Sequence, residues 1–340
     1  MRNFLLFFVL LLLAAAEQAL AQEPIIHCTD STFCVPSVYG MPRTKGIEIK
    51  QERVMDYRIH SSSDPALAGN NTAEVSLNRR WRISVRAPLL LREGIKVAIG
   101  IRYFHEEYRF ENISTLDYPF YQSLEDKSLK SFGGALYVIK PFLGNKYLLF
   151  RVSANLNGDY FIETASKKDF LKFSISPLMG WKKGPYLSYA AGLAYSYDFG
   201  SANIYPIFSY NRTFNEHWGL ESILPVQVKF RYRANDKNFV YFITELNGAN
   251  YRIQLEDDPV FGSVNDLHLN KSEIRFLASY EREIHDWLWM NVEAGVRANF
   301  DFSLHQGPGR RAPELIDNNF KPAMVISGGI FIVPPRKFLN

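Results

Sequence analysis

The feature that most constrains the fold is a pair of long alternating segments between residues 73 and 103. In the first, apolar side chains fall on every second position over Val75–Ala87, apart from Arg79, with mostly charged or polar residues between them. The alternation resumes after the turn Arg92–Gly94. Since successive side chains of a strand point to opposite faces, each segment has one apolar and one polar face. The pair predicts a β-hairpin whose strands exceed the ~5–6 residues usual in soluble sheets and reach the roughly 9–11 residues that cross a bilayer.

The same pattern recurs about twelve times along the chain. Membrane-spanning strands must close on themselves, because hydrocarbon offers no partner for the backbone groups of a sheet edge. We therefore predict an all-β chain that forms an antiparallel transmembrane meander β-barrel of 12–14 strands, with 14 preferred. A soluble periplasmic β-sandwich would alternate as well. The long strands and their heavily charged polar face favour the barrel.

The strand count depends on two positions in the second half of the chain. Pro225 interrupts the alternating run Trp218–Arg233, and because proline cannot donate to a ladder, we predict a β-bulge there. Asn247-Gly248 is a hairpin-turn signal inside the run Phe239–Leu255, so we predict two strands in that run. Counted from the first strand, the strand that ends at Arg233 runs outward, and counted back from the C-terminus, the strand that starts near Lys271 runs inward. Both directions hold only if the run Phe239–Leu255 forms two strands, which gives a total of 14. The alternative, if one candidate strand is wrong, is 12.

Short and long connections alternate along the chain. Outer-membrane barrels have short periplasmic turns and longer extracellular loops, with both termini in the periplasm. We therefore predict that the short connections are periplasmic. They lie at Arg92–Gly94, Pro141–Lys146, Lys182–Pro185, Asn215–His217 and His285–Trp287.

The N-terminus has the features of a cleaved signal peptide. Arg2 precedes the apolar run Phe4–Ala16, and Ala19-Leu20-Ala21 forms an A-x-A cleavage site. No later segment offers the ~18 uninterrupted apolar residues of a transmembrane helix. We predict a bacterial outer-membrane location and four parts, namely a signal peptide (1–21), an exported segment (22–45), the barrel (46–333) and a C-terminal tail (334–340).

The two cysteines, Cys28 and Cys34, lie close together near the mature N-terminus. Export places them in an oxidising compartment, so we predict that they form one small disulfide loop. Free or metal-bound thiols are the alternative, but no histidine set with zinc-site spacing surrounds them. The exported segment either lies in the periplasm or plugs the lumen, and the sequence leaves this open.

Composition removes several classes of protein. The mean hydropathy of −0.16 is too polar for a bundle of membrane helices. Aromatic residues reach 15%, which fits the aromatic girdles of a membrane barrel. The net charge of +4 is spread through the alternating segments, so we predict no nucleic-acid partner. The expected partners are outer-membrane lipid and the barrel-assembly machinery, while the oligomeric state is not indicated.

From Trp218 onward, three segments resemble an uncharacterised family of bacterial outer-membrane barrel proteins, described only as a domain of unknown function. The segments are LPVQVKFRYRAND, GANYRI and SEIRFLASYEREIHDWLWMNVEAGVRANF. The resemblance spans about Gly46 to Val333. It implies an outer-membrane barrel and supplies no catalytic residues.

The polar face of the strands is the most informative candidate site. Rings of basic side chains select anions in pores, whereas small barrels fill their interiors with side chains. Both an anion-biased channel and a closed, salt-bridged lumen therefore fit the sequence. The residues that periodicity places in the lumen are Arg80, Arg82, Arg86, Lys96, Arg102, Glu221, Lys229, Arg231, Arg233, Glu293, Arg297 and Asp301.

Two functions of different class follow. The first is a passive channel or transporter for small polar or anionic solutes. The second is a structural or binding barrel with a filled lumen that acts through its extracellular loops or a partner. An outer-membrane lipid-modifying enzyme is a minor alternative, because His105, His268 and His305 lie near a strand end or in predicted loops. No nucleophile stands in a recognisable motif, so we predict no enzyme, catalytic residue, cofactor or metal.

Overall fold

The computed structural model describes residues 35–116, 118–142, 144–160, 170–255, 261, 266–309 and 311–338. The predicted signal peptide and the two cysteines, Cys28 and Cys34, lie outside these ranges, so the cleavage site and the disulfide stay predictions. Within the described ranges, no helix is both long and apolar enough to cross a bilayer.

Antiparallel strands make up most of the regular structure. In chain order the elements are β1 (Ile47–Val54), β2 (Tyr57–Ser63), β3 (Asn71–Arg92), β4 (Ile95–Phe110), η2 (Ile113–Thr115), α2 (Pro119–Lys127), β5 (Leu129–Pro141), β6 (Lys146–Gly158), β7 (Leu171–Lys182), β8 (Leu187–Ser196), β9 (Asn203–Thr213), β10 (Trp218–Leu224), β11 (Gln227–Asn235), β12 (Asn238–Ile253), β13 (Leu267–His285), β14 (Leu288–Gln306), β15 (Glu314–Phe320), β16 (Ala323–Ile332) and η3 (Arg336–Phe338).

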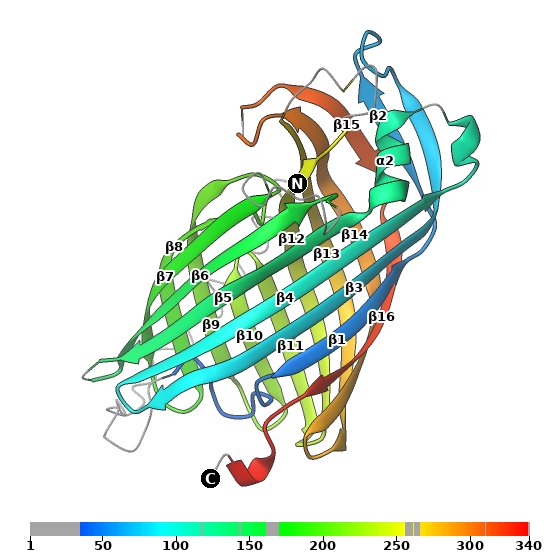
Figure 1. Ribbon diagram of the computed structural model, residues 1–340. Coiled ribbons are helices and arrows are strands. Elements are labelled where there is room, and N and C mark those ends of the chain that lie inside the picture. Colours follow the sequence, from blue (N-terminus) through cyan, green and yellow to red (C-terminus); the bar gives the residue numbers. More distant parts are fainter. Residues whose placement is uncertain are drawn as a thin grey trace, which may run out of the picture.

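Over the described residues, sixteen strand segments form a closed barrel of fourteen wall strands (Figure 1). β1 and β2 are one wall strand interrupted at residues 55–56, since β1 pairs with β3 and β16 while β2 pairs with β3 and β15. β15 and β16 are the last wall strand, interrupted at residues 321–322, and β14 pairs with both. The predicted fold, an antiparallel meander barrel of fourteen strands, is confirmed.

Alternation along each strand separates the outer surface from the interior. On β16, Met324, Ile326 and Ile330 are 57%, 43% and 50% exposed, whereas Val325 and Phe331 are buried. Apolar side chains are exposed in the same way all around the wall. Because soluble monomers rarely expose apolar patches beyond a few hundred Å², an apolar outer surface of this extent belongs in a bilayer.

The connections give the barrel two different ends. At the short-turn end, where β1 begins and β16 stops, the described chain has the five turns that the sequence predicted and another at residues 236–237. The long-loop end contains regular structure within its connections, where the alternating pattern is mostly absent. Residues 111–131 contain η2 and α2, residues 306–320 contain β15, and β13 begins inside residues 257–271. α2, β15 and the start of β13 are ordered because they contribute buried apolar side chains to one cluster.

The bulge predicted at Pro225 is wrong, because the proline forms a turn. Residues 225–226 connect β10 to β11, and Ile223 pairs with Gln227 at the base of this hairpin. Proline lacks the N–H that would carry the ladder forward, so the strand ends there. β11, which contains Arg233, therefore runs toward the short-turn end and not outward as predicted.

The turn predicted at Asn247-Gly248 is also wrong, because β12 is continuous through both residues. Gly248 pairs in register with Ser272 of β13. A Cβ at Gly248 would collide with the carbonyl of Asp198 in the β8–β9 connection. The glycine thus permits a close approach of two backbones, which the local sequence cannot distinguish from a turn. The missed turn at Pro225 removes one strand from the predicted count, and the wrong turn at Asn247-Gly248 adds one. The predicted total of fourteen is therefore still correct.

Candidate functional site

The long-loop end of the lumen is filled by an apolar plug. α2 begins at Pro119, which suits a first helical position because its missing N–H needs no partner there. The buried side chains Phe120, Tyr121 and Leu124 pack against inward side chains of the wall. The Tyr121 hydroxyl lies 2.5 Å from Ser61 Oγ, so this buried polar group is satisfied. We call α2 and its wall contacts the plug; the wall contributes Val54, Tyr57, Ile59, Val75, Tyr108, Phe110, Tyr251, Leu269, Phe302, Leu304, Ile316 and Phe320.

A backbone bridge crosses the barrel beside the plug. β6 and β12 pair in parallel at Gly158 and Arg252, although β7–β11 separate them in the wall. The neighbouring Asp159 carboxylate is buried, accepts the Gln254 N–H at 2.9 Å and lies 4.0 Å from Lys127 Nζ. Burial raises the pKa of Asp159 to about 6, against the opposing effects of the Gln254 hydrogen bond and the Lys127 charge.

Next to the plug, toward the short-turn end, buried ion pairs cross the lumen. Arg80 of β3 is their centre, with its guanidinium 2.8 Å from Glu106 and 2.6 Å from Glu273. Glu52 of β1 lies 2.9 Å from the same guanidinium. Lys271, Arg275 and Arg297 pair with these same three carboxylates. We call the seven residues the ionic layer, namely Arg80, Lys271, Arg275, Arg297, Glu52, Glu106 and Glu273.

The ionic layer fills the lumen between β1, β3, β4, β13 and β14 with buried charges. Desolvating a buried ion costs several kcal/mol, and only close partners of opposite charge offset that cost. Each charge of the layer has such a partner inside it. Arg297 also lies 4.3 Å from the centroid of the Tyr57 ring, which joins the layer to the plug.

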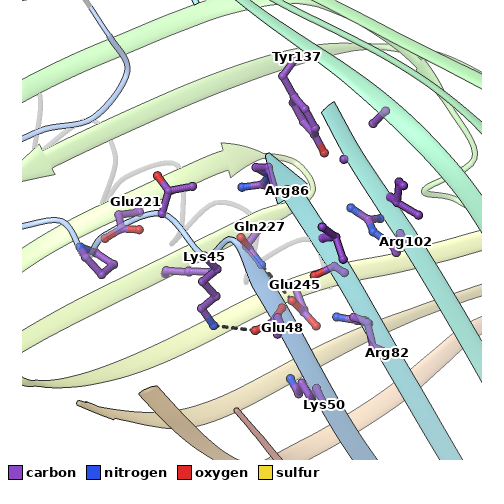
Figure 2. Close-up of a pocket in the computed structure, with 18 of the residues that line it drawn as sticks. Lys45, Glu48, Lys50, Arg82, Arg86, Arg102, Tyr137, Glu221, Gln227 and Glu245 are labelled. Atoms are coloured by element: carbon purple, nitrogen blue, oxygen red, sulfur yellow. Dashed lines mark hydrogen bonds and ion pairs between the residues drawn. The ribbon is translucent and has the colours of Figure 1, made fainter. Parts of the chain in front are cut away.

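Beyond the ionic layer the lumen widens into a cavity of about 390 Å³, which we call the chamber (Figure 2). Of the described residues that line it, eight are Lys or Arg and five are Glu, so its charge is biased toward positive. Figure 2 shows Arg86, Arg102 and Tyr137 on one side of it and Glu221, Gln227 and Glu245 on another. The charged lining is Arg43, Lys45, Lys50, Arg82, Arg86, Arg102, Arg151, Lys229, Glu48, Glu221, Glu245, Glu281 and Glu293.

Each carboxylate of the chamber lies in an ion pair with a nearby cation. Glu48 and Glu281 both lie 2.8 Å from Lys45 Nζ. Burial opposes the charge of Lys45, but these two carboxylates outweigh it and raise the pKa of Lys45 above its ordinary value. The acidic residues are therefore neutralised locally. Arg43 pairs with Glu283 and Asp286, whereas the remaining chamber cations form no ion pair with a carboxylate of the described chain, namely Arg82, Arg86, Arg102, Arg151 and Lys229. The remaining pairs are Glu221–Arg231, Glu245–Arg275 and Glu293–Lys50.

The described part of the exported segment, residues 35–45, crosses the short-turn mouth of the chamber. On one side the Tyr39 N–H donates to the Pro185 carbonyl at 2.7 Å, and Thr213 donates to the Tyr39 carbonyl at 2.5 Å. On the other side Arg43 lies 3.1 Å from Glu283. Residues 41–45 line the chamber. The sequence left the position of this segment open, and its described part forms a floor under the lumen.

The predicted lumen-lining residues fall into distinct places. Arg80 and Arg297 belong to the ionic layer, where Arg80 pairs with three carboxylates and Arg297 pairs with Glu273. Arg231 is buried against Glu221. The residues that line the chamber are Arg82, Arg86, Arg102, Glu221, Lys229 and Glu293.

The remaining three predicted residues lie toward the two ends of the barrel. Arg233 bonds Asp236 at the short-turn end, and Lys96 is half-buried beside the β3–β4 turn. Asp301 lies at the long-loop end, beyond a register shift between β13 and β14, and accepts a hydrogen bond from Ser303 at 2.5 Å. The shift moves Asp301 out of the phase that places Arg297 inside, which simple alternation does not foresee.

Among the chamber residues that sequence reasoning missed are Tyr137 and Arg151. The signal was present, because the apolar residues Phe150 and Val152 flank Arg151 in an alternating segment. Strict alternation places Arg151 inside, and the structure has it lining the chamber.

Of the three histidines considered as catalytic residues, His305 contacts a serine hydroxyl. Ser303 Oγ lies 2.8 Å from His305 Nε2 and 2.5 Å from Asp301 Oδ1. The carboxylate accepts the serine proton, so the serine lies between acid and imidazole and not at the end of the row, where it lies in a catalytic triad. Within the described residues, no group of three or more His, Cys, Asp or Glu side chains is placed to hold a metal ion.

No family model and no curated protein matches the chain. It is similar to solved structures of a Pseudomonas aeruginosa FadL homologue (8% identity, TM-score 0.40, covering 91% of this chain and 99% of that one) and a NanC porin (8%, 0.31, 82% and 100%). It is also similar to a bacterial polysaccharide outer membrane secretin (8%, 0.36, 85% and 99%). The chain thus resembles outer-membrane barrels, and similarity this low says nothing about solute or site.

Proposed function

We propose that the chain is a gated outer-membrane barrel that transports small polar or anionic solutes. The observation that carries the proposal is the chamber, a cavity of about 390 Å³ with a positive bias inside a membrane-type barrel. A barrel that served only as a scaffold would gain nothing from unpaired cations in its lumen, because like charges repel and each is costly to desolvate.

The proposed orientation follows from the two ends of the barrel. Outer-membrane barrels place short turns in the periplasm and long loops outside. The chamber would then lie at the periplasmic side and the plug at the extracellular side. Insertion would depend on outer-membrane lipid and the barrel-assembly machinery, as the apolar outer surface requires.

The proposed gate is the plug. Its helix α2 belongs to a loop, the β4–β5 connection, and is not part of the wall. A loop can leave the lumen without breaking any ladder between wall strands. Passage would also require the ionic layer to rearrange, since its pairs cross the lumen next to the plug.

Conductance in planar lipid bilayers tests the proposal. Wild-type mature protein should be closed or nearly so. A variant with residues 119–127 replaced by a Gly-Ser linker should conduct more often, and so should Tyr121→Ala combined with Leu124→Ala. The matched control is Gln122→Ala combined with Asp126→Ala, two exposed positions of the same helix, which should stay closed. Folding of each variant is checked by heat-modifiable gel mobility. Because the ionic layer also lies in the path, a further variant combines the linker replacement with Arg80→Ala and Glu273→Ala. No current from any folded variant, this one included, would reject transport.

A second candidate is a structural or binding barrel with a filled lumen that acts through its extracellular loops or a partner. The filling of the long-loop half by the plug and the ionic layer favours it, as does the floor formed by residues 35–45. The same conductance experiment separates the two candidates, because a purely structural barrel stays silent after the plug is removed.

A further inference from the structure

We infer that Arg86, Arg102 and Arg151, grouped around Tyr137, bind one carboxylate or phosphate group of a small solute. We call these four residues the arginine cluster. The inference rests on the proposed function for its role in transport and deepens it by naming the binding residues and the chemistry of the ligand. Binding itself is a property of the chamber and can be measured without transport.

Strand register brings the arginine cluster together. Arg86 of β3 pairs with Gly100 of β4, and Tyr137 of β5 pairs with Arg151 of β6. A Cβ at Gly100 would lie 3.1 Å from the Tyr137 ring, so the glycine makes room for that ring over β4. The ring in turn has the Arg86 guanidinium 5.0 Å and the Arg151 guanidinium 5.8 Å from its centroid.

The arginine cluster has no internal counter-charge. Among the described residues, none of its three arginines forms an ion pair with a carboxylate, while the carboxylates of the chamber are held by other cations. Arg151 Nε is buried and meets no hydrogen-bond acceptor in the described chain. Three like charges held together in a partly enclosed space create a positive potential that an anion would relieve.

The chemistry of the arginine cluster selects oxyanions. A guanidinium presents a planar fork of N–H donors that matches the two oxygens of a carboxylate or phosphate. Lysines would attract an anion as point charges, but they would not orient it. Ser84, Ser153 and Asn155 line the same wall of the chamber and offer polar contacts to the remainder of a hydroxylated solute.

Isothermal titration calorimetry on the refolded, mature chain in detergent tests the inference. The probes are inorganic phosphate and succinate, at low ionic strength because salt screens partly exposed charges. At least one probe should bind with one-to-one stoichiometry. The probe with the higher affinity identifies whether the ligand group is a phosphate or a carboxylate. Arg102→Gln and Arg151→Gln should each weaken it by roughly tenfold or more, as expected for a lost charge-assisted hydrogen bond. Arg102→Lys, which keeps the charge without the planar fork, should fall between Arg102→Gln and wild type.

The matched control is Arg58→Gln, which removes the same charge from an exposed arginine outside the chamber. It should leave the affinity within about twofold of wild type, because its charge is solvent-screened. No saturable binding of either probe, or an equal loss with Arg58→Gln, would overturn the inference. Anion binding that depends on Arg102 and Arg151 in a barrel that never conducts would support the binding site and reject transport alone.

Discussion

The same strand carries arginines into two opposite environments. On β3, Arg80 is 4% exposed and bonded to three carboxylates, whereas Arg86 lines the chamber and has no carboxylate partner in the described chain. The two side chains share an inward face, and alternation predicted both. The difference comes from neighbours, since β1, β4 and β13 bring carboxylates to Arg80 but not to Arg86.

This contrast separates ion pairing from solute binding. In the ionic layer, paired charges stabilise each other and exclude solvent. In the chamber, the carboxylates are neutralised by nearby cations and the arginine cluster is left available. Arginine therefore stabilises the ionic layer at one position and lines the chamber at another. The positions of nearby glutamates decide which of the two roles each arginine has.

The largest expected effect comes from breaking the ionic layer. Glu273→Gln keeps the side-chain volume, but it removes one of three carboxylates from Arg80 and the only carboxylate that pairs with Arg297 among the described residues. An uncompensated buried charge costs about 3–5 kcal/mol. Urea unfolding of the refolded barrel in detergent should show this loss in the free energy of unfolding. Glu48→Gln, which removes one of the two partners of Lys45, should cost about 1 kcal/mol or less. Equal losses would mean that the two regions do not differ.

An intermediate effect is expected at Asp159, whose carboxylate is buried with its nearest cation 4.0 Å away. Burial raises its pKa to about 6, above the unfolded value. Its contribution to stability is therefore fully present below the unfolded pKa and is lost as pH rises through about 6. Relative to Asp159→Asn, the wild type should lose on the order of 2 kcal/mol between pH 4 and pH 7.5. Unfolding midpoints of both proteins across this pH range measure the loss. A stability difference between wild type and Asp159→Asn that does not change with pH would contradict the prediction.

The smallest effect on stability is expected in the arginine cluster. Arg102→Gln removes a charge that has no ion pair to lose and that repels its neighbours. The free energy of unfolding should stay within about 0.5 kcal/mol of wild type or rise slightly. A loss as large as that of Glu273→Gln, under the same urea titration, would show that Arg102 is part of the structural ion-pair network.

Much of the architecture could be predicted before the structure was known. The alternating segments predicted the barrel, its short-turn end and the right number of strands, although that number came from two errors that cancel. Proline fits a bulge as well as a turn, so the sequence did not identify the turn at Pro225. Gly248 was predicted to form a turn, because a turn glycine and a glycine beneath a crossing backbone have the same local sequence signature. Only Asp198, fifty residues earlier in the chain, distinguishes them.

The candidate site was predicted only in outline. Alternation placed Arg82, Arg86 and Arg102 inside, where the structure has them. It also placed Arg80 and Arg297 inside, but it could not tell that they belong to the ionic layer. Ion pairing depends on which strands face one another across the barrel, and no local sequence pattern encodes which strands those are.

The sequence by itself determined which residues of each strand face lipid and which face the lumen, because apolar and polar residues alternate. This alternation is what predicted a closed membrane barrel. That information is local, because each side chain's direction follows from its own position on the strand. What only the tertiary structure decided is the state of the lumen. A loop helix became a plug, seven charges from five strands became an ion-pair layer, and the arginine cluster was left without a carboxylate partner among the described residues. These outcomes depend on contacts between residues far apart in the chain, so they emerge only when the barrel closes.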